Sequence, residues 1–265
     1  MRIHRLIAAA ATVTALAFPG NAIAKPTITL SGSTSVAPLA SKLAKAYVKK
    51  HKVQFKILQG GSDIGVSDVA HGRVTLGMSS RDPLPSDPGG LVFNRIARDG
   101  ICVATNPGNP ISNLSQAQVQ GIFSGRVRSW SQVPGARASG TIDLMVRNAA
   151  SGTQDAFQNI FMGQSLRVSP SASQKPSNGR VQQAISSDKN AIGYVDFNFT
   201  SGLHTVPYKG VSCTLRNAKS GQYGGVRNFW LVSRGKAAGA AAAWLKWIKG
   251  SQARRIIATN WVPLK

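Results

Sequence analysis

Three short clusters of hydroxyl and glycine residues have the chemistry to hold an oxyanion. They occupy residues 31–35, 60–63 and 151–153, and each precedes a segment with a helical pattern. A helix N-terminus presents free backbone N–H groups and partial positive charge, and small residues let an anion approach them. Arg147 stands four residues before the third cluster and can donate two parallel hydrogen bonds to a phosphate-like group. The clusters therefore predict a cage of donors around a tetrahedral oxyanion.

Each cluster also has an ordinary structural interpretation when it is considered alone. Ser151, Thr34 and Ser35 are suitable helix N-caps, and Ser62 with Asp63 fits a turn. Three such clusters in one chain, together with an arginine, favour the anion site over three independent caps.

The elements that must position these clusters alternate along the chain. Strands are expected at 28–30, 53–58 and 74–78, with helices at 36–51 and 64–70 between them. This order predicts a doubly wound α/β lobe whose loops gather at the carboxyl ends of the strands. Further strands are expected at 91–93, 100–105, 141–147 and 191–199, and further helices at 116–123, 237–249 and 251–259.

The N-terminal segment is typical of an export signal. Arg2 and Arg5 precede an apolar run, and Ala22-Ile23-Ala24 fits a signal-peptidase site. Residues 1–24 are therefore interpreted as a signal peptide cleaved after Ala24, which places the mature protein in the periplasm of a diderm cell. Cys102 and Cys213 are compatible with one disulfide in such an oxidising compartment.

The formal charge of +23, from 32 basic and 9 acidic residues, indicates attraction of anions. The basic residues are scattered and no long basic run interleaves with aromatic residues, which argues against a nucleic-acid surface. His51, His71 and His204 stand away from the three clusters, and the chain has no Gly-x-Ser-x-Gly motif. The sequence therefore predicts a protein that is not an enzyme, with no catalytic residue, no metal site and no cofactor.

The order of several motifs resembles the phosphate-binding protein of bacterial phosphate ABC importers. The resemblance covers nearly the whole chain after residue 24 and includes SGSTSVAPLA, NPISNLSQAQVQGIFSGRVRSW, VRNAASGTQDAF and AIGYV. It implies a type II periplasmic-binding-protein fold, with two α/β lobes, a ligand cleft and two crossover strands. The expected division is 25–105 for the first part of lobe 1, 106–204 for lobe 2 and 205–265 for the rest of lobe 1.

The resemblance also implies the residues that bind the ligand. Carried over by position, they are Thr34, Ser35, Ser62, Arg147, Ser151, Gly152 and Thr153. Further candidates in the same loops are Ser33, Asp63, Ser80 and Arg81.

Position 80 departs from the pattern of the family. Many members have an aspartate where this chain has Ser80, and that carboxylate accepts the proton of hydrogen phosphate, which sulfate lacks. Asp63 and Asp82 are candidates to replace this acceptor. Asp63 fits a helix cap equally well, however, and Asp82 fits a partner of Arg81.

The expected function is capture of inorganic phosphate by a monomer and its delivery to an inner-membrane ABC permease. Ser80 keeps open a receptor for sulfate, molybdate or a phosphonate. A secreted phosphatase is the less favoured alternative.

Overall fold

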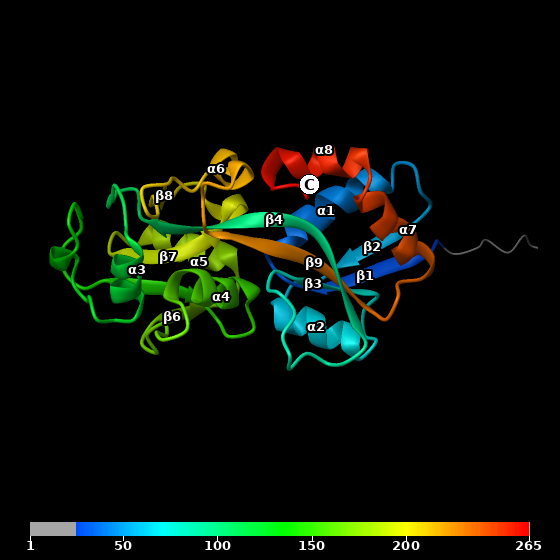
Figure 1. The fold of residues 1–265 in the computed structure, drawn as a ribbon, viewed down its shortest axis with the longest axis horizontal. Helices are drawn as coiled ribbons and strands as arrows, with labels where there is room; N and C mark the ends of the chain where they lie inside the picture. Colours follow the sequence, from blue (N-terminus) through cyan, green and yellow to red (C-terminus); the bar gives the residue numbers. More distant parts are fainter. Residues whose placement is uncertain (1–24, 265) are drawn as a thin grey trace, which may run out of the picture.

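The computed structural model describes residues 25–264, so the expected signal peptide lies outside the described residues. Two α/β lobes lie side by side, and the long strands β4 (Leu91–Thr105) and β9 (Val226–Arg234) run between them (Figure 1). One continuous strand order, β2-β1-β3-β9-β4-β7-β5-β6, passes through both lobes. The two-lobed α/β architecture expected from the sequence is confirmed.

The first lobe is built on a sheet in which parallel and antiparallel strands meet. Strands β1 (Thr27–Gly32), β2 (Gln54–Ile57) and β3 (Leu76–Ser79) are parallel, and β9 joins them antiparallel to β3. Helices α1 (Val36–Tyr47), α7 (Gly239–Ile248) and α8 (Ser251–Asn260) cover one face, and α2 (Ser62–Ala70) covers the other (Figure 1).

The second lobe continues from the carboxyl half of β4. That half pairs antiparallel with β7 (Ala191–Asp196) and β8 (His204–Thr205), and β5 (Asp143–Arg147) lies parallel to both β7 and β6 (Ser173–Lys175). The helices of this lobe are α3 (Gln116–Phe123), α4 (Gly152–Phe157), α5 (Asn178–Ser187) and α6 (Leu215–Ser220), with short helical turns η1 (Trp130–Gln132), η2 (Gln158–Met162) and η3 (Phe197–Phe199).

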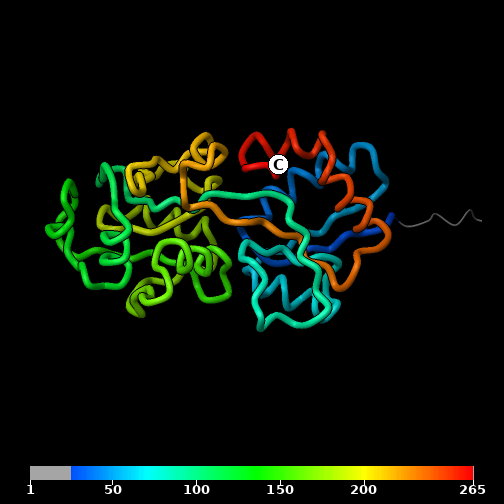
Figure 2. The backbone as a smooth tube through the Cα atoms, viewed as in Figure 1, coloured from blue at the N-terminus to red at the C-terminus, as the bar shows by residue number. Residues whose placement is uncertain are grey.

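Each lobe has its own apolar core. One core draws on α1, α7 and α8 packed over β1, β3 and β9, and the other draws on α3 and α4 packed over β5 and β7. Along the chain, the core of the first lobe draws on residues up to Ala97, and the core of the second lobe draws on residues from Ile101 to Tyr223. From Phe229 onward the core residues belong to the first lobe again. The blue and red ends of the chain accordingly lie in the same half of the molecule (Figure 2). The lobe boundaries at 105/106 and 204/205 remain predictions.

The expectation of separate strands at 91–93 and 100–105 was wrong. Residues 91–105 form one strand that pairs with β9 as far as Gly100 and with β7 from Ile101. The intervening polar residues hid this continuity, because Asn94 and Arg95 lie where β4 is only partly covered.

The structure settles the pairing of the two cysteines, which the sequence left open. Cys102 on β4 and Cys213, in the loop before α6, form a disulfide with a Cα–Cα distance of 5.6 Å. Among the described residues, no helix is both long and apolar enough to cross a membrane.

Candidate functional site

The N-termini of α1, α2, α4 and α5 converge between the lobes, and small hydroxyl residues occupy them. The Ser33 hydroxyl accepts hydrogen bonds from the backbone N–H groups of Ser35 and Val36 at 3.2 and 3.3 Å. The N-cap of α1 therefore does not need the side chains of Thr34 and Ser35. Their hydroxyls, both buried, are left to make other contacts.

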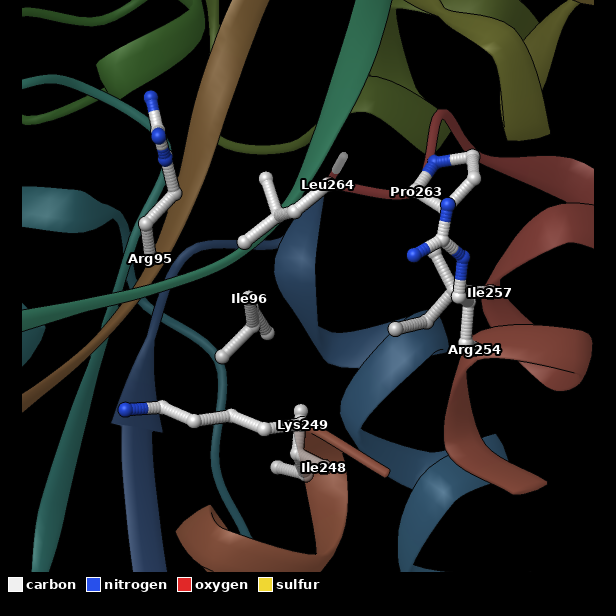
Figure 3. A pocket seen from close by; sticks show the side chains of 8 residues that line it. All are labelled: Arg95, Ile96, Ile248, Lys249, Arg254, Ile257, Pro263 and Leu264. Carbon is white, nitrogen blue, oxygen red and sulfur yellow. The ribbon is translucent and has the colours of Figure 1, made fainter. Parts of the chain in front are cut away.

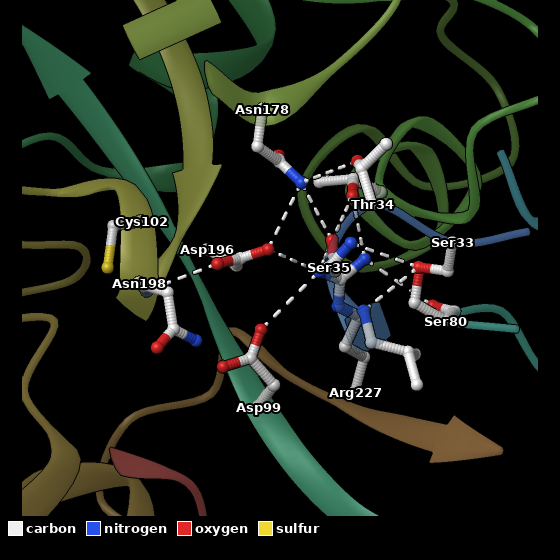
Figure 4. A network of polar contacts seen from close by, with 12 residues as sticks. Ser33, Thr34, Ser35, Ser80, Asp99, Cys102, Asn178, Asp196, Asn198 and Arg227 are labelled. Atoms are coloured by element: carbon white, nitrogen blue, oxygen red, sulfur yellow. Dashed lines mark hydrogen bonds and ion pairs between the residues drawn. The ribbon is translucent and has the colours of Figure 1, made fainter. Parts of the chain in front are cut away.

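Thr34 is held as a hydrogen-bond donor by the groups around it (Figure 4). Its hydroxyl oxygen accepts from the Arg147 guanidinium and from the Asn178 amide, both at 3.2 Å. A hydroxyl has two lone pairs and one hydrogen. The Asn178 amide has two hydrogens for three acceptors, Thr34, Ser35 and Asp196, so it shares one of them. Because both lone pairs of Thr34 face donors, its own hydrogen is directed to a further acceptor.

The same accounting applies to Ser35 and Thr153. The Ser35 hydroxyl oxygen accepts from Asn178 and Arg227, both at 2.8 Å, and lies 3.1 Å from the Thr153 hydroxyl. Thr153 also accepts from Arg227 at 2.9 Å. If Ser35 donates to Thr153, then Thr153 in turn has a hydrogen to donate. The network thus orients hydroxyl hydrogens as donors, as an oxyanion requires.

A second cluster of hydroxyl side chains, beside that of Thr34, Ser35 and Thr153, consists of Ser33, Ser62 and Ser80. Ser33 donates to the Ser80 hydroxyl at 2.8 Å, and Ser62 accepts from the Ser80 backbone N–H at 3.0 Å. The hydroxyls of Ser62 and Ser80 lie 3.3 Å apart, and either can donate to the other. When Ser80 donates to Ser62, Ser80 keeps one lone pair, so this pair can present either a donor or an acceptor.

Arg147 ends β5 and is buried at the centre of the site. Carbonyl oxygens of Lys175 and Pro176 accept from its guanidinium at 3.2 and 2.9 Å, and its backbone N–H donates to the Tyr194 hydroxyl. Burial lowers the pKa of Arg147 to about 10, so it is charged at neutral pH. Fixing a cation where water is excluded strengthens its attraction for an anion.

Two buried carboxylates stand behind the hydroxyls. Asp99 on β4 and Asp196 at the end of β7 lie 3.4 and 3.5 Å from the Arg227 guanidinium, and Asp196 also accepts from Asn178. Burial raises the pKa of both carboxyls, and the charge of Asp196 raises that of Asp99 further. Arg227 therefore supplies the positive charge that balances these buried carboxyls.

The lobes approach each other closely at Gly152. A Cβ atom at this position would overlap the Ser62 hydroxyl and would lie 2.7 Å from the Arg81 backbone nitrogen. The Asp63 backbone N–H donates across the same gap to the carbonyl of Ala150 at 3.2 Å. Glycine at the start of α4 is thus required for the second lobe to reach the first.

The structure brings most of the expected site residues together. The two clusters of hydroxyl side chains and the arginine beside them comprise Ser33, Thr34, Ser35, Ser62, Ser80, Arg147 and Thr153. Gly152 lines the same gap, and Ser151 caps α4 by accepting from the backbone N–H groups of Thr153 and Gln154.

Asp63 and Arg81 are engaged with each other instead. The Arg81 Nε lies 2.7 Å from the Asp63 carboxylate, and its other nitrogens bind Asp87. Asp63 lies in the first turn of α2 and makes no cap, so the capping interpretation was wrong. Asp82 accepts from Asn228 and Trp230 and offers Arg81 its carbonyl, so the predicted ion pair with Arg81 was wrong as well.

Sequence reasoning missed four residues of the network: Asp99, Asn178, Asp196 and Arg227. Asp196 carried a usable signal, because it is a charged residue at the end of the fully apolar strand that begins at Ala191. Arg227 lies two residues before Phe229 in a strand of alternating burial, on its buried side. Asn178 had no comparable signal.

A separate hollow lies on the first lobe. It has a volume of about 280 Å³, an apolar floor that includes Ile96 and Ile257, and basic side chains at Arg95, Lys249 and Arg254 (Figure 3). None of its lining residues belongs to the hydroxyl network. No group of three or more potential metal ligands (His, Cys or acidic side chains) occurs within residues 25–264.

Comparisons with known proteins agree with this architecture. A model of the PBP superfamily domain matches residues 19–251. The chain is 25% identical over 247 residues to the phosphate-binding protein PstS of Bacillus subtilis, a match that covers 91% of this chain and 81% of that protein. It is 36% identical over 107 residues to PstS 2 of Streptococcus pneumoniae, covering 40% and 37%.

Solved structures show the same similarity in three dimensions. One, from Clostridium perfringens, is described as a phosphate ABC transporter substrate-binding protein with bound phosphate. It has a TM-score of 0.84 and 28% identity, and the match covers 90% of this chain and all of that one. An ABC-type phosphate transport receptor from Vibrio cholerae has a TM-score of 0.73 and 26% identity, with 89% of this chain covered.

Proposed function

Since this chain belongs to the PBP superfamily, we propose that it binds inorganic phosphate between its lobes and delivers it to an inner-membrane ABC permease. The observation that carries this proposal is the orientation of the Thr34 and Thr153 hydroxyls. Arg147 and Asn178 engage the lone pairs of Thr34. Arg227 engages one lone pair of Thr153 and Ser35 engages the other when it donates, and both hydrogens are then directed to an acceptor. Preorganised donors beside Arg147 suit a dehydrated oxyanion.

Similarity to proteins whose names state phosphate binding supports phosphate as that oxyanion. The Bacillus subtilis relative is a phosphate-binding protein, and the Clostridium perfringens structure contains phosphate. The Ser62–Ser80 pair can accept the proton of hydrogen phosphate when Ser80 donates to Ser62. Because the same pair can also turn a donor outward, we expect sulfate to be the strongest competing ligand.

Function as a receptor, without catalysis, agrees with the surroundings of the histidines. His51 stacks on Tyr47, and the rings of His71 and His204 bind backbone carbonyls. None of these three rings can activate a hydroxyl of the network. We further propose that the protein acts as a monomer and does not bind nucleic acid. We also propose that it is located in the periplasm after the signal peptide has been cleaved behind Ala24.

The decisive experiment is calorimetric titration of ligand-stripped protein, residues 25–265, with phosphate and with sulfate. Arg147→Ala is expected to weaken phosphate binding by about 100-fold or more, because a buried charge-assisted pair is lost. Arg95→Ala is the matched control, since Arg95 is exposed and lies outside the network. Equal affinity for both anions would replace phosphate by a general oxyanion as ligand, and binding of neither would overturn the proposal.

A further inference from the structure

Arg227 occupies a place that no other cation of the site shares. It lies on β9 directly opposite Asp99 on β4, and these are the two strands that run between the lobes. Its guanidinium is buried, whereas that of Arg95, on the same pair of strands, is exposed. We call the pair of strands β4 and β9 between the lobes the hinge. Arg227 therefore extends from the hinge into the site.

A single guanidinium here contacts both lobes. Nη2 donates to Ser35 at the N-terminus of α1 in the first lobe, at 2.8 Å. Nη1 donates to Thr153 at the N-terminus of α4 in the second lobe, at 2.9 Å. Arg147, by contrast, stands on the second lobe and reaches across to Thr34. Arg227 can keep both of its contacts only while the two helix N-termini are close together.

The orientation of this guanidinium is fixed from behind. Asp99 comes from the hinge strand β4, and Asp196 from the last residue of β7 in the second lobe. Both carboxyls are fully buried. The guanidinium also donates to the Ser80 carbonyl at 3.4 Å. Its Nε–H is buried as well and has no hydrogen-bond partner among the described residues, so the group retains a donor beyond its contacts with Ser35, Ser80, Thr153 and the two aspartates.

We propose that Arg227 couples binding of the anion to closure of the lobes. The inference rests on the proposed function, because the anion is the ligand that draws the donors of both lobes together. When the lobes open, Thr153 moves away from Ser35, and Arg227 remains with the hinge and its two carboxylates. When an oxyanion enters, Arg227 attracts it and completes its bonds to both helix N-termini only in the closed state. Arg227 is thus a positioning residue for closure, and Arg147 is the arginine that holds the ligand in either state.

The test measures affinity and closure separately. Phosphate affinity is measured by calorimetry, and closure is measured as the decrease in radius of gyration, by small-angle X-ray scattering, at saturating phosphate. Wild type and Arg95→Gln are expected to bind and to contract equally. Arg227→Gln is expected to bind phosphate about 10- to 100-fold more weakly and to show no contraction even when saturated.

Two further variants guard against loss of folding. Arg227→Gln leaves two buried carboxylates without their cation, which is destabilising. The double variant Asp99→Asn/Arg227→Gln removes one of these charges, and Asp99→Asn alone retains Arg227. The double variant is expected to lose contraction while Asp99→Asn keeps it. Arg227→Lys is expected to contract only in part, because a single ammonium cannot present the planar fork of an arginine to both lobes.

The possible outcomes separate the two claims. If wild type binds no phosphate, the proposed function falls, and this inference falls with it. If wild type binds and contracts, and the folded double variant contracts to the same extent, the inference alone is overturned.

Discussion

At the scale of single residues, the site fixes the direction in which its buried hydroxyl hydrogens point. A hydroxyl is normally free to rotate, but Thr34 is constrained because Arg147 and Asn178 engage its oxygen. The amide of Asn178 is oriented in turn by the Asp196 carboxylate, which can only accept. A buried aspartate that need not touch the ligand thus helps to set the direction of the Thr34 hydroxyl hydrogen.

Removing one oriented hydroxyl tests this assignment. Thr34→Val preserves shape but deletes the donor, so phosphate affinity is expected to fall by about 1.5–3 kcal/mol, the worth of a hydrogen bond to a charged group. Thr29→Val, on β1, is the control, because its hydroxyl binds the exposed Thr75 far from the site. Calorimetry gives both values, and an unchanged affinity in Thr34→Val would contradict the donor role.

At the scale of elements, the loop between β3 and β4 is secured by ion pairs and not by the ligand. Arg81 donates two hydrogen bonds to Asp87, at 2.7 and 3.0 Å, and a third to Asp63. Burial alone would raise the pKa of Asp87, but the bonds from Arg81 hold it below its ordinary value of 3.8. The charged pair therefore stabilises the loop beside Ser80.

This pair gives stability a defined pH dependence. Because the pKa of Asp87 is lowered on folding, its contribution is present above pH 3.8 and is lost as the pH falls through the folded value. At pH 7, Asp87→Asn is expected to lower the free energy of unfolding by about 1.5–3 kcal/mol, and the difference from wild type should shrink at about pH 3. Urea unfolding at both pH values measures it.

Asp63→Asn is the matched control for Asp87→Asn. Asp63 binds the same arginine, but its side chain is 47% exposed, so the expected change is under about 1 kcal/mol. A pH-independent effect of Asp87→Asn would show that the residue acts through packing alone.

Local chemistry made the hydroxyl clusters predictable from sequence, because a strand, a small-residue loop and a helix follow each other directly. The residues behind them were not predictable in the same way. Arg227 and Asp99 are neighbours only through the register of β9 on β4, and the sequence pattern divided β4 into two strands. The interpretation of Arg81 failed for a related reason: Asp63, Asp82 and Asp87 are all within reach, and only the fold decides among them.

At the scale of the whole molecule, the distribution of charge is one-sided. All 9 acidic residues are aspartates, and none occurs after Asp196, while basic residues number 32. Asp99 and Asp196 are buried, and Asp68, like Asp63 and Asp87, is paired with an arginine. Arg147 and Arg227 are buried as well, so the exposed surface keeps about the strongly positive net charge that the composition gives, and a dianion should be attracted to it from a distance.

Capture of phosphate is accordingly expected to be sensitive to salt. Raising the ionic strength from about 0.01 to 0.15 M shortens the screening length from about 30 to 8 Å, so the association rate should fall several-fold while the dissociation rate changes little. Stopped-flow fluorescence measures both rates. A variant with Lys49, Lys50 and Lys52 changed to glutamine should show a lower rate and a weaker salt dependence, and a rate unaffected by salt would exclude steering.

Strand β9 lies between β3 and β4 in the sheet, although the ribosome makes it long after both. Until residues 226–234 emerge, the facing edges of β3 and β4 have no strand between them, so the first lobe stays incomplete. The core of the second lobe draws on residues 101–223 and can form earlier. The lobe whose synthesis begins first is therefore completed last. Its N-terminal strands and helices are expected to stay incompletely folded until β9 has been synthesised.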